Sequence, residues 1–259
     1  MDIHGFLTTH QLPSSYAETA QKWFTPLCEQ LLKHQEGATK PFIVGINGSQ
    51  GSGKSTLTSF IEYYLSSVHG KQVVSLSIDD FYFDQSQRNA LAIKVHPLLA
   101  TRGVPGTHNI PLALDTLRNL DSGSRTLLPR FDKATDNPFP TEQWPVIASS
   151  PDFIILEGWC VGATPQSQSE LKPPINHLEE VEDPLGIWRS FVNTELAGDY
   201  QTLFAKIDYR IMLKAPSFDC VYQWRLEQEH KLAKKAAKNS TGVMSDLSLI
   251  HISEPTRLG

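Results

Sequence analysis

The segment that sets the fold class reads Pro41-Phe42-Ile43-Val44-Gly45-Ile46-Asn47-Gly48-Ser49-Gln50-Gly51-Ser52-Gly53-Lys54-Ser55. It begins with a mostly apolar run, which is typical of a short strand buried in a sheet. A glycine-rich turn follows, and a helix is expected over residues 54–66. In this context the pattern Gly48-x-x-x-x-Gly53-Lys54-Ser55 predicts a phosphate-binding loop. A chance match in a glycine-rich turn is the competing interpretation, and the flanking strand and helix argue against it.

The residue types in this loop suit the binding of ATP together with Mg²⁺. Glycines let successive backbone N–H groups point at phosphate oxygens, where a Cβ would block the approach. The helix that begins near Lys54 directs the positive end of its dipole at the same anion. We expect Lys54 to reach the β- and γ-phosphates and the hydroxyl of Ser55 to bind Mg²⁺. The predicted nucleotide-binding residues are the loop and the position after it: Gly48, Ser49, Gln50, Gly51, Ser52, Gly53, Lys54, Ser55 and Thr56.

The rest of the chain alternates strand-like and helix-like segments. Apolar runs at residues 72–78, 153–156 and 209–213 are expected to be strands. Helical patterns cover residues 14–34 (broken or kinked at Pro26), 111–120, 185–206 and 217–238. This alternation predicts an α/β fold with a doubly wound, mostly parallel sheet, as in P-loop nucleoside triphosphate hydrolases, with ligands at the carboxyl ends of the strands. We divide the chain into an N-terminal helical segment (1–40), a phosphate-loop domain (41–246) containing a substrate-facing loop region (85–151), and a tail (247–259).

Composition narrows the class of protein. The 259 residues carry a net charge of −5, which argues against a non-specific nucleic-acid binder. No segment approaches the roughly 18 apolar residues needed to span a bilayer, and the first residues lack the pattern of a signal peptide. Cys28, Cys160 and Cys220 form neither a disulfide framework nor a metal-binding pattern, so a reducing cytoplasm is the simplest interpretation. Nothing in the sequence indicates an oligomeric state.

Acidic residues close two of the predicted strands. Asp79 and Asp80 end the second strand, where a small-molecule kinase would place a base beside the acceptor hydroxyl. Neighbouring strand residues point to opposite faces, so one of the two is expected in the site. We predict that Asp79 is the base; the alternatives are Asp80, or capping of the following turn by both. Glu157 closes the strand at 153–156 and is predicted to hold Mg²⁺ through water or to orient the Asp, unless it is simply solvated.

The sequence signatures of two other classes of phosphate-loop protein are absent from this chain. The chain contains neither the Asn-Lys-x-Asp motif of GTPases nor the Leu-Ser-Gly-Gly signature of transporter ATPases. A kinase for a small molecule is therefore the favoured class.

The last predicted helix carries charges on an apolar face. Arg225 and Glu229 project from that face, where an unpaired charge is costly. In the structural interpretation, the two residues form an ion pair at helical spacing. In the functional interpretation, Arg225 is a lid arginine that reaches the transferring phosphoryl group.

Five further blocks resemble a known family. They are Ser77-Ile78-Asp79-Asp80-Phe81-Tyr82, Arg102-Gly103-Val104-Pro105-Gly106-Thr107-His108, Leu128-Pro129-Arg130-Phe131-Asp132-Lys133, Leu156-Glu157-Gly158-Trp159 and Gln223-Trp224-Arg225-Leu226-Glu227-Gln228-Glu229. With the phosphate loop, they resemble the D-glycerate 3-kinase family, within the wider group of uridine kinases, pantothenate kinases and phosphoribulokinases. The match runs from about residue 41 to 244, and the Arg-Gly-x-Pro-Gly-Thr-His block is its most specific part.

The resemblance implies a kinase that transfers the γ-phosphate of ATP to the 3-hydroxyl of glycerate, with Lys54, Asp79 and Arg225 as catalytic residues. Glycerate carries a carboxylate, which cations could neutralise and orient. The candidates for this role are Arg102, His108, Arg130 and Lys133. For each of them the alternative is that it supports a loop or faces solvent.

Two features depart from the family pattern. Asn109 stands where the family has Asp, which weakens any metal or proton role at that position. Residues 247–257 resemble the conceptual translation of a sequencing adapter, so we expect a non-native tail and the loss of the family's carboxyl-terminal segment. An ordinary frayed end is the alternative interpretation.

Two other functions stay open at this point. A kinase of the same group that acts on a nucleoside, pantothenate or a sugar phosphate would share these motifs. A regulatory module that has lost catalysis would bind ATP without releasing ADP in response to an acceptor.

Overall fold

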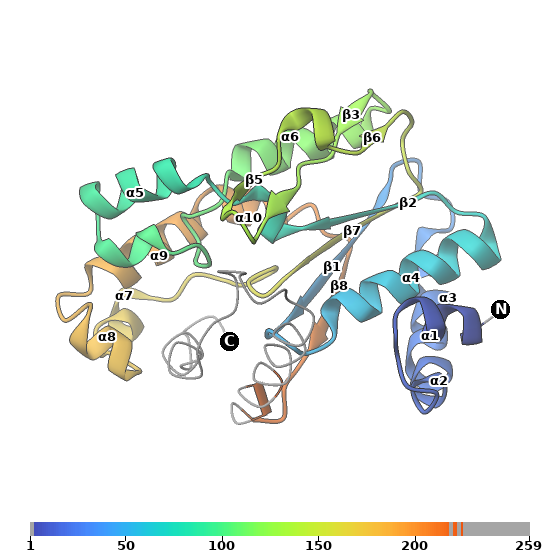
Figure 1. Ribbon diagram of the computed structural model, residues 1–259, viewed down its shortest axis with the longest axis horizontal. Helices are drawn as coiled ribbons and strands as arrows, with labels where there is room; N and C mark the ends of the chain where they lie inside the picture. Colours follow the sequence, from blue (N-terminus) through green and yellow to red (C-terminus); the bar gives the residue numbers. More distant parts are fainter. Residues whose placement is uncertain (1–2, 218–219, 222–223, 225–259) are drawn as a thin grey trace.

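A four-stranded parallel sheet forms the centre of the molecule (Figure 1). The computed structural model describes residues 3–217, 220, 221 and 224. The strand order is β2–β7–β1–β8. The strands are β1 (Phe42–Gly48), β2 (Val73–Ser77), β7 (Phe153–Gly158) and β8 (Tyr209–Leu213). Because all four run in the same direction, their carboxyl ends lie along one edge, and the predicted α/β fold with a parallel sheet is confirmed.

The register places the inner strands β1 and β7 at the centre of the core. Ile43 lies opposite Ile154, and Ile46 lies opposite Glu157 near the carboxyl ends. The apolar residues of β7 from Phe153 to Leu156 are fully buried, as a continuous apolar run predicts for a strand covered on both faces.

Helices cover both faces of this sheet (Figure 1). On one face, α4 (Lys54–His69) packs with the N-terminal helices against β1 and β7, and Leu57, Phe60 and Ile61 are buried there. On the other face, α6 (Ile110–Asp121) and α10 (Asp199–Phe204) share a second core with β2 and β7.

The N-terminal segment belongs to the first of these cores. It contains α1 (Ile3–Thr9), α2 (Tyr16–Thr19), a π-helical turn (Ala20–Phe24) and α3 (Thr25–Gln35). Pro26 lies in the first turn of α3, where its missing N–H has no helical partner to lose. Near Pro26, where the sequence predicts a break or kink, the structure has a π-helical turn that ends just before α3.

The region between β2 and β7 is more ordered than the sequence indicated. Besides α6 it holds α5 (Gln85–Lys94), which was expected to be loop. The Asp84 side chain caps α5 and Gln87 bonds back to the Asp84 N–H, so this Asp-x-x-Gln pattern was the available signal. The other short elements are three 3-10 turns (Ile78–Phe81, Pro97–Ala100, Thr141–Gln143) and four two-residue strands, β3 (Thr126–Leu127), β4 (Phe131–Asp132), β5 (Asn137–Pro138) and β6 (Val146–Ile147).

The helix expected over residues 185–206 is in fact two helices. They are α9 (Ile187–Ala197) and α10, and Gly198 separates them because its backbone leaves the helical region. Two short helices precede them, α7 (Gln168–Leu171) and α8 (His177–Val181). Most of the last predicted helix (217–238) and the whole 247–259 tail lie outside the described residues. In the part of the chain that the structure describes, no helix has both the length and the hydropathy to cross a membrane.

Candidate active site

The phosphate loop connects β1 to α4 at the carboxyl edge of the sheet. Gly51 and Gly53 have φ values of +79° and +91°, a left-handed conformation that disfavours any side chain with a Cβ. Gly53 is also the N-cap residue of α4, which begins at Lys54. The Lys54 ammonium folds back over the loop and donates a hydrogen bond of 2.9 Å to the Ser49 carbonyl.

The loop fits a bound phosphate group. The hydroxyls of Ser49 and Ser52 are buried, and neither has a hydrogen-bond partner among the residues that the structure describes. A buried hydroxyl without a partner is costly, and an anion in the loop would supply the missing acceptor. A Cβ added to Gly48 would lie 2.6 Å from the Ser52 hydroxyl, so only glycine allows the loop this closeness.

A cavity of about 310 Å³ lies directly above the loop. It gathers residues from the loop, from the ends of β2 and β7, and from the hairpin formed by β4 and β5. Its lining residues are Gln50, Gly51, Gly53, Lys54, Ser55, Thr56, Ser77, Asp79, Lys133, Glu157, Gly158, Trp159 and Trp224. The structure thus brings together Lys54, Asp79, Lys133 and Glu157, which the sequence analysis singled out from four separate segments.

Asp79 presents its carboxylate to this cavity. The Lys133 ammonium lies 2.7 Å from Oδ2 of Asp79, and the Tyr82 hydroxyl also hydrogen-bonds the carboxylate. Burial raises the pKa of Asp79, but the charge and hydrogen bond of Lys133 outweigh that effect, so the net pKa lies below the usual value. Asp79 is therefore ionised at neutral pH, as a proton acceptor must be.

Asp80, in contrast, is held by structural partners. Its carboxylate accepts hydrogen bonds from the backbone N–H groups of Ser77 and Phe131 and forms an ion pair of 3.2 Å with Arg130. Together with the Ser77 hydroxyl, which accepts from the Asp79 N–H, it caps the 3-10 turn after β2. Of the two neighbours, only Asp79 lines the cavity among the described residues.

Lys54 and Glu157 both line the cavity, and the charge of each acts on the pKa of the other. Burial lowers the pKa of Lys54, and the negative charges of Glu157 and Asp79 act in the opposite direction. Burial raises the pKa of Glu157, while a hydrogen bond from Ser77 and the charge of Lys54 act to lower it. A phosphate bound in the loop would add the negative charge that favours the protonated Lys54.

The residues around Lys54 also suit Mg²⁺ as a companion of bound phosphate. The Ser55 hydroxyl and the Glu157 carboxylate line the same cavity and are oxygen ligands of the kind that Mg²⁺ prefers. In the described part of the chain, no group of three or more His, Cys, Asp or Glu residues is arranged to hold a metal by itself. This donor set matches a cation that is held mainly by phosphate oxygens and water.

Two of the predicted acceptor-binding cations are engaged in the walls of the site. Arg102 forms an ion pair with Asp136 and lies over the ring of Phe131, 5.6 Å from its centroid. Asp136 is also paired, at 2.7 Å, with the buried Arg88. Arg130 pairs with Asp80 and donates to the Pro129 carbonyl. These contacts agree with the alternative interpretation, in which the two arginines support loops.

His108 is buried and is not among the described residues that line the cavity, so its predicted contact with the acceptor carboxylate stays a prediction. Burial lowers its pKa to about 4, so the imidazole is neutral at pH 7. Its ring stacks on Tyr82 with centroids 4.3 Å apart, and Nδ1 lies 2.6 Å from the Tyr200 hydroxyl. His108 therefore supports Tyr82, and through it the Asp79 carboxylate, from below.

Three aromatic residues of the site were not predicted as functional. Tyr82 bonds Asp79, Trp159 lines the cavity, and Trp224 packs on the phosphate loop, where a Cβ on Gly51 would lie 2.6 Å from the Trp224 Cβ. All three lie in the sequence blocks that resemble the glycerate kinase family, and this membership could have marked them as site residues. Arg225, one residue further on, lies outside the described residues and stays a prediction.

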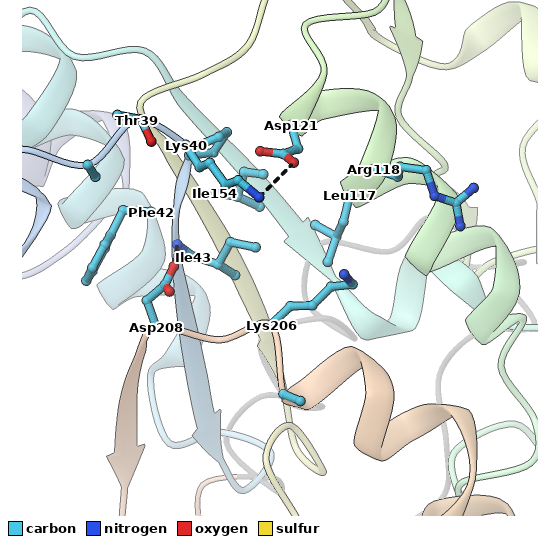
Figure 2. Close-up of a pocket in the computed structure, with 13 residues that line it drawn as sticks. Thr39, Lys40, Phe42, Ile43, Leu117, Arg118, Asp121, Ile154, Lys206 and Asp208 are labelled. Carbon is cyan, nitrogen blue, oxygen red and sulfur yellow. Dashed lines mark hydrogen bonds and ion pairs between the residues drawn. The ribbon is translucent and has the colours of Figure 1, made fainter.

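A larger cavity of about 430 Å³ lies at the opposite, amino-terminal ends of the strands (Figure 2). Ile43, Ile154 and Leu117 line it, and Lys40 forms a loose pair of 3.9 Å with Asp121 across it. None of the described residues that the sequence analysis assigned to a site lines this cavity. The larger cavity is therefore not the candidate active site, because Lys54, Asp79, Lys133 and Glu157 all line the smaller one.

The fold and the site define a P-loop kinase. Residues 43–164 match the phosphoribulokinase/uridine kinase family. An uncharacterized kinase of Schizosaccharomyces pombe, mug58, is 34% identical over 86% of this chain and 83% of its own length. The chain belongs to the phosphoribulokinase/uridine kinase family of P-loop kinases.

Relatives within this family include glycerate kinases. A chloroplastic D-glycerate 3-kinase of Arabidopsis thaliana is 28% identical to this chain. The match covers 73% of this chain and 41% of the plant protein's length. The solved structure of D-glycerate 3-kinase from Cryptococcus neoformans superposes with a TM-score of 0.74 at 27% identity, covering 90% of this chain and 84% of that one. Pantothenate kinases of Streptococcus pyogenes are also similar, one at 30% identity over 46% of this chain and 37% of its own length.

Proposed function

We propose that the protein is an ATP-dependent kinase that transfers the γ-phosphate to the 3-hydroxyl of glycerate. The observation that carries the proposal is the meeting of Lys54, Asp79 and Lys133 around one cavity on the phosphate loop. Similarity to D-glycerate 3-kinases over most of this chain supports glycerate as the acceptor.

In this proposal each residue of the cavity has a distinct task. Backbone N–H groups of residues 48–55 hold the phosphates, and Lys54 stabilises charge on the transferring group. Ser55 and Glu157 hold Mg²⁺, which offsets the negative charge of the β- and γ-phosphates when bound. Asp79 accepts the proton of the acceptor hydroxyl, and Lys133 binds the acceptor carboxylate. Arg225 is assigned to the transferring phosphoryl group by the family resemblance alone.

The proposed acceptor can be tested directly. ADP release should be measured with D-glycerate, L-glycerate, glycerol, uridine and pantothenate, and phosphorus NMR should identify the phosphorylated position. We expect turnover with glycerate and 3-phosphoglycerate as the product. Glycerol should be poorer in kcat/KM by at least about a hundredfold, because it lacks the carboxylate that forms charge-assisted hydrogen bonds.

The same assay separates the alternative functions. Turnover with pantothenate or uridine but not with glycerate would identify another kinase of the group. Tight ATP binding without acceptor-dependent ADP release would indicate a regulatory module and contradict the proposal.

A further inference from the structure

Lys133 differs from the other predicted acceptor-binding cations because it reaches the cavity. It lies on the turn between β4 and β5, just after Asp132, and lines the cavity together with Asp79. Arg102 and Arg130 are not among the described residues that line it, and both are paired with carboxylates in its walls.

The contact between Lys133 and Asp79 is also easier to exchange than those of the two arginines. The Lys133 side chain is 61% exposed, and Asp79 is the only partner of its ammonium group in the described part of the chain. A lysine ammonium has three donors and rotates freely, and ion pairs open to water are weak. A second anion in the cavity can therefore compete for Lys133.

In the observed arrangement Asp79 is poorly placed to accept a proton. Its Oδ2 holds the Lys133 ammonium at 2.7 Å, and the Tyr82 hydroxyl takes another acceptor position of the same carboxylate. A hydroxyl entering the cavity meets a carboxylate whose charge is already compensated. This reduces its strength as a base.

We propose that Lys133 makes the base available only to charged acceptors: the carboxylate of the acceptor draws the ammonium away from Asp79, which then accepts the hydroxyl proton. The inference rests on the proposed function of the same cavity and adds a specificity device to it. Water and neutral alcohols do not displace Lys133, so Asp79 stays compensated and ATP is not spent without an acceptor.

The reaction that Lys133 would suppress is hydrolysis of ATP. The oxygen of a water molecule bonds to the γ-phosphorus, and the bond from that phosphorus to the β,γ-bridging oxygen breaks, its electron pair leaving on ADP. The water proton passes to Asp79, so ATP and water give ADP, phosphate and a proton. Removing the ammonium group should make Asp79 a stronger base for this step.

The experiment compares ATP hydrolysis without acceptor in Lys133→Met, Lys133→Arg and the wild-type chain, all at saturating ATP. We expect hydrolysis in Lys133→Met to rise at least about fivefold, a part of what a freed general base contributes. Lys133→Arg keeps the positive charge and should stay near the wild-type rate. Lys94→Met, an exposed lysine at the end of α5, is the matched control and should change nothing.

Acceptor kinetics supply the second measurement. In Lys133→Met the KM for glycerate should rise about tenfold or more, since a charge-assisted hydrogen bond is lost. The kcat with glycerol should increase, because a neutral acceptor no longer meets a compensated Asp79. Melting curves should show that each variant is folded.

A wild-type hydrolysis rate in Lys133→Met, or an equal rise in Lys133→Arg, would overturn the inference and leave Lys133 as a simple binding residue. The test is independent of the acceptor, because hydrolysis needs only ATP. If the wild-type chain did not phosphorylate glycerate, the proposed function would fail, while the hydrolysis rates would still decide the role of Lys133.

Discussion

The phosphate loop and the proposed acceptor side of the site, which we define as residues 79–80 and 130–133, hold their polar groups in opposite states. In the phosphate loop the buried hydroxyls of Ser49 and Ser52 have no partner within the described part of the chain. On the acceptor side, Asp79 and Asp80 each hold a cation, Lys133 and Arg130. Among the described residues, the loop therefore has free donors for an anion, whereas in our proposal the acceptor must compete with the ion pair between Lys133 and Asp79.

The difference follows from how each region is built. Residues 48–55 are contiguous, and their backbone conformation alone points donors at a phosphate. The acceptor side is assembled from segments some 50 residues apart, whose charges would be costly to bury without partners. We therefore expect substitutions in the loop to affect turnover with every acceptor, and substitutions on the acceptor side to have different effects according to the partner lost.

The largest effect is expected for Lys54→Ala. The variant should lose essentially all turnover, a change on the order of several kcal/mol in transition-state stabilisation, because no other loop residue supplies a positive charge. The measurement is kcat/KM for ADP release with each acceptor, and Lys40→Ala at the far end of the sheet is the control. Near-normal activity in Lys54→Ala would contradict the assignment of the loop.

The next largest effect should separate the two adjacent acids. Asp79→Asn should lower kcat by about 10²–10⁴-fold with little change in ATP affinity, because the amide cannot accept a proton. Asp80→Asn weakens a pair in the wall of the site and should mainly lower the melting temperature. If the kinetic loss appeared in Asp80→Asn and not in Asp79→Asn, the choice between them would be wrong.

A smaller effect concerns pH and the buried His108. Its folded-state pKa of about 4 lies below the usual value of 6.5, so the unfolded chain binds this proton first as the pH falls. The stability from His108 is thus complete above pH 6.5 and is lost as the pH falls toward 4. It should amount to about 2 kcal/mol between pH 7.5 and pH 5.

Urea unfolding at several pH values measures this contribution. His108→Gln cannot take up a proton, so its unfolding free energy should fall less steeply over the same pH range than that of the wild type. Parallel pH dependences for the two proteins would show that His108 does not titrate as a buried group.

The smallest effect is expected for Arg102→Gln. Because Arg102 holds Asp136, the variant should lose roughly 1 kcal/mol of unfolding free energy and equal, small fractions of activity with glycerate and glycerol. Lys133→Gln is the comparison, since it should reduce kcat/KM for glycerate while activity with glycerol does not fall. A selective loss for glycerate in Arg102→Gln would return this arginine to the acceptor site.

Much of the fold was predictable because its signals are local. Apolar runs located all four strands of the main sheet, and the glycine pattern placed the phosphate loop between β1 and α4. Helix α5 was missed although Asp84 and Gln87 form a capping box at its start, because its sequence has a weak apolar period. The break between α9 and α10 was missed because a single residue, Gly198, was read as part of a longer helix.

The amino-acid sequence predicted the phosphate-binding loop, the parallel sheet and the acids at its carboxyl edge. It did so because strand periodicity and loop conformation depend on residues that are neighbours in the chain. Packing of the folded chain sets how the charges of the site are paired: Asp79 with Lys133, Asp80 with Arg130, and Arg102 with Asp136. It also made His108 neutral by burying it. Which cation meets which acid, and which histidine loses its charge, depend on packing between distant segments, and that packing leaves no periodic trace in the sequence.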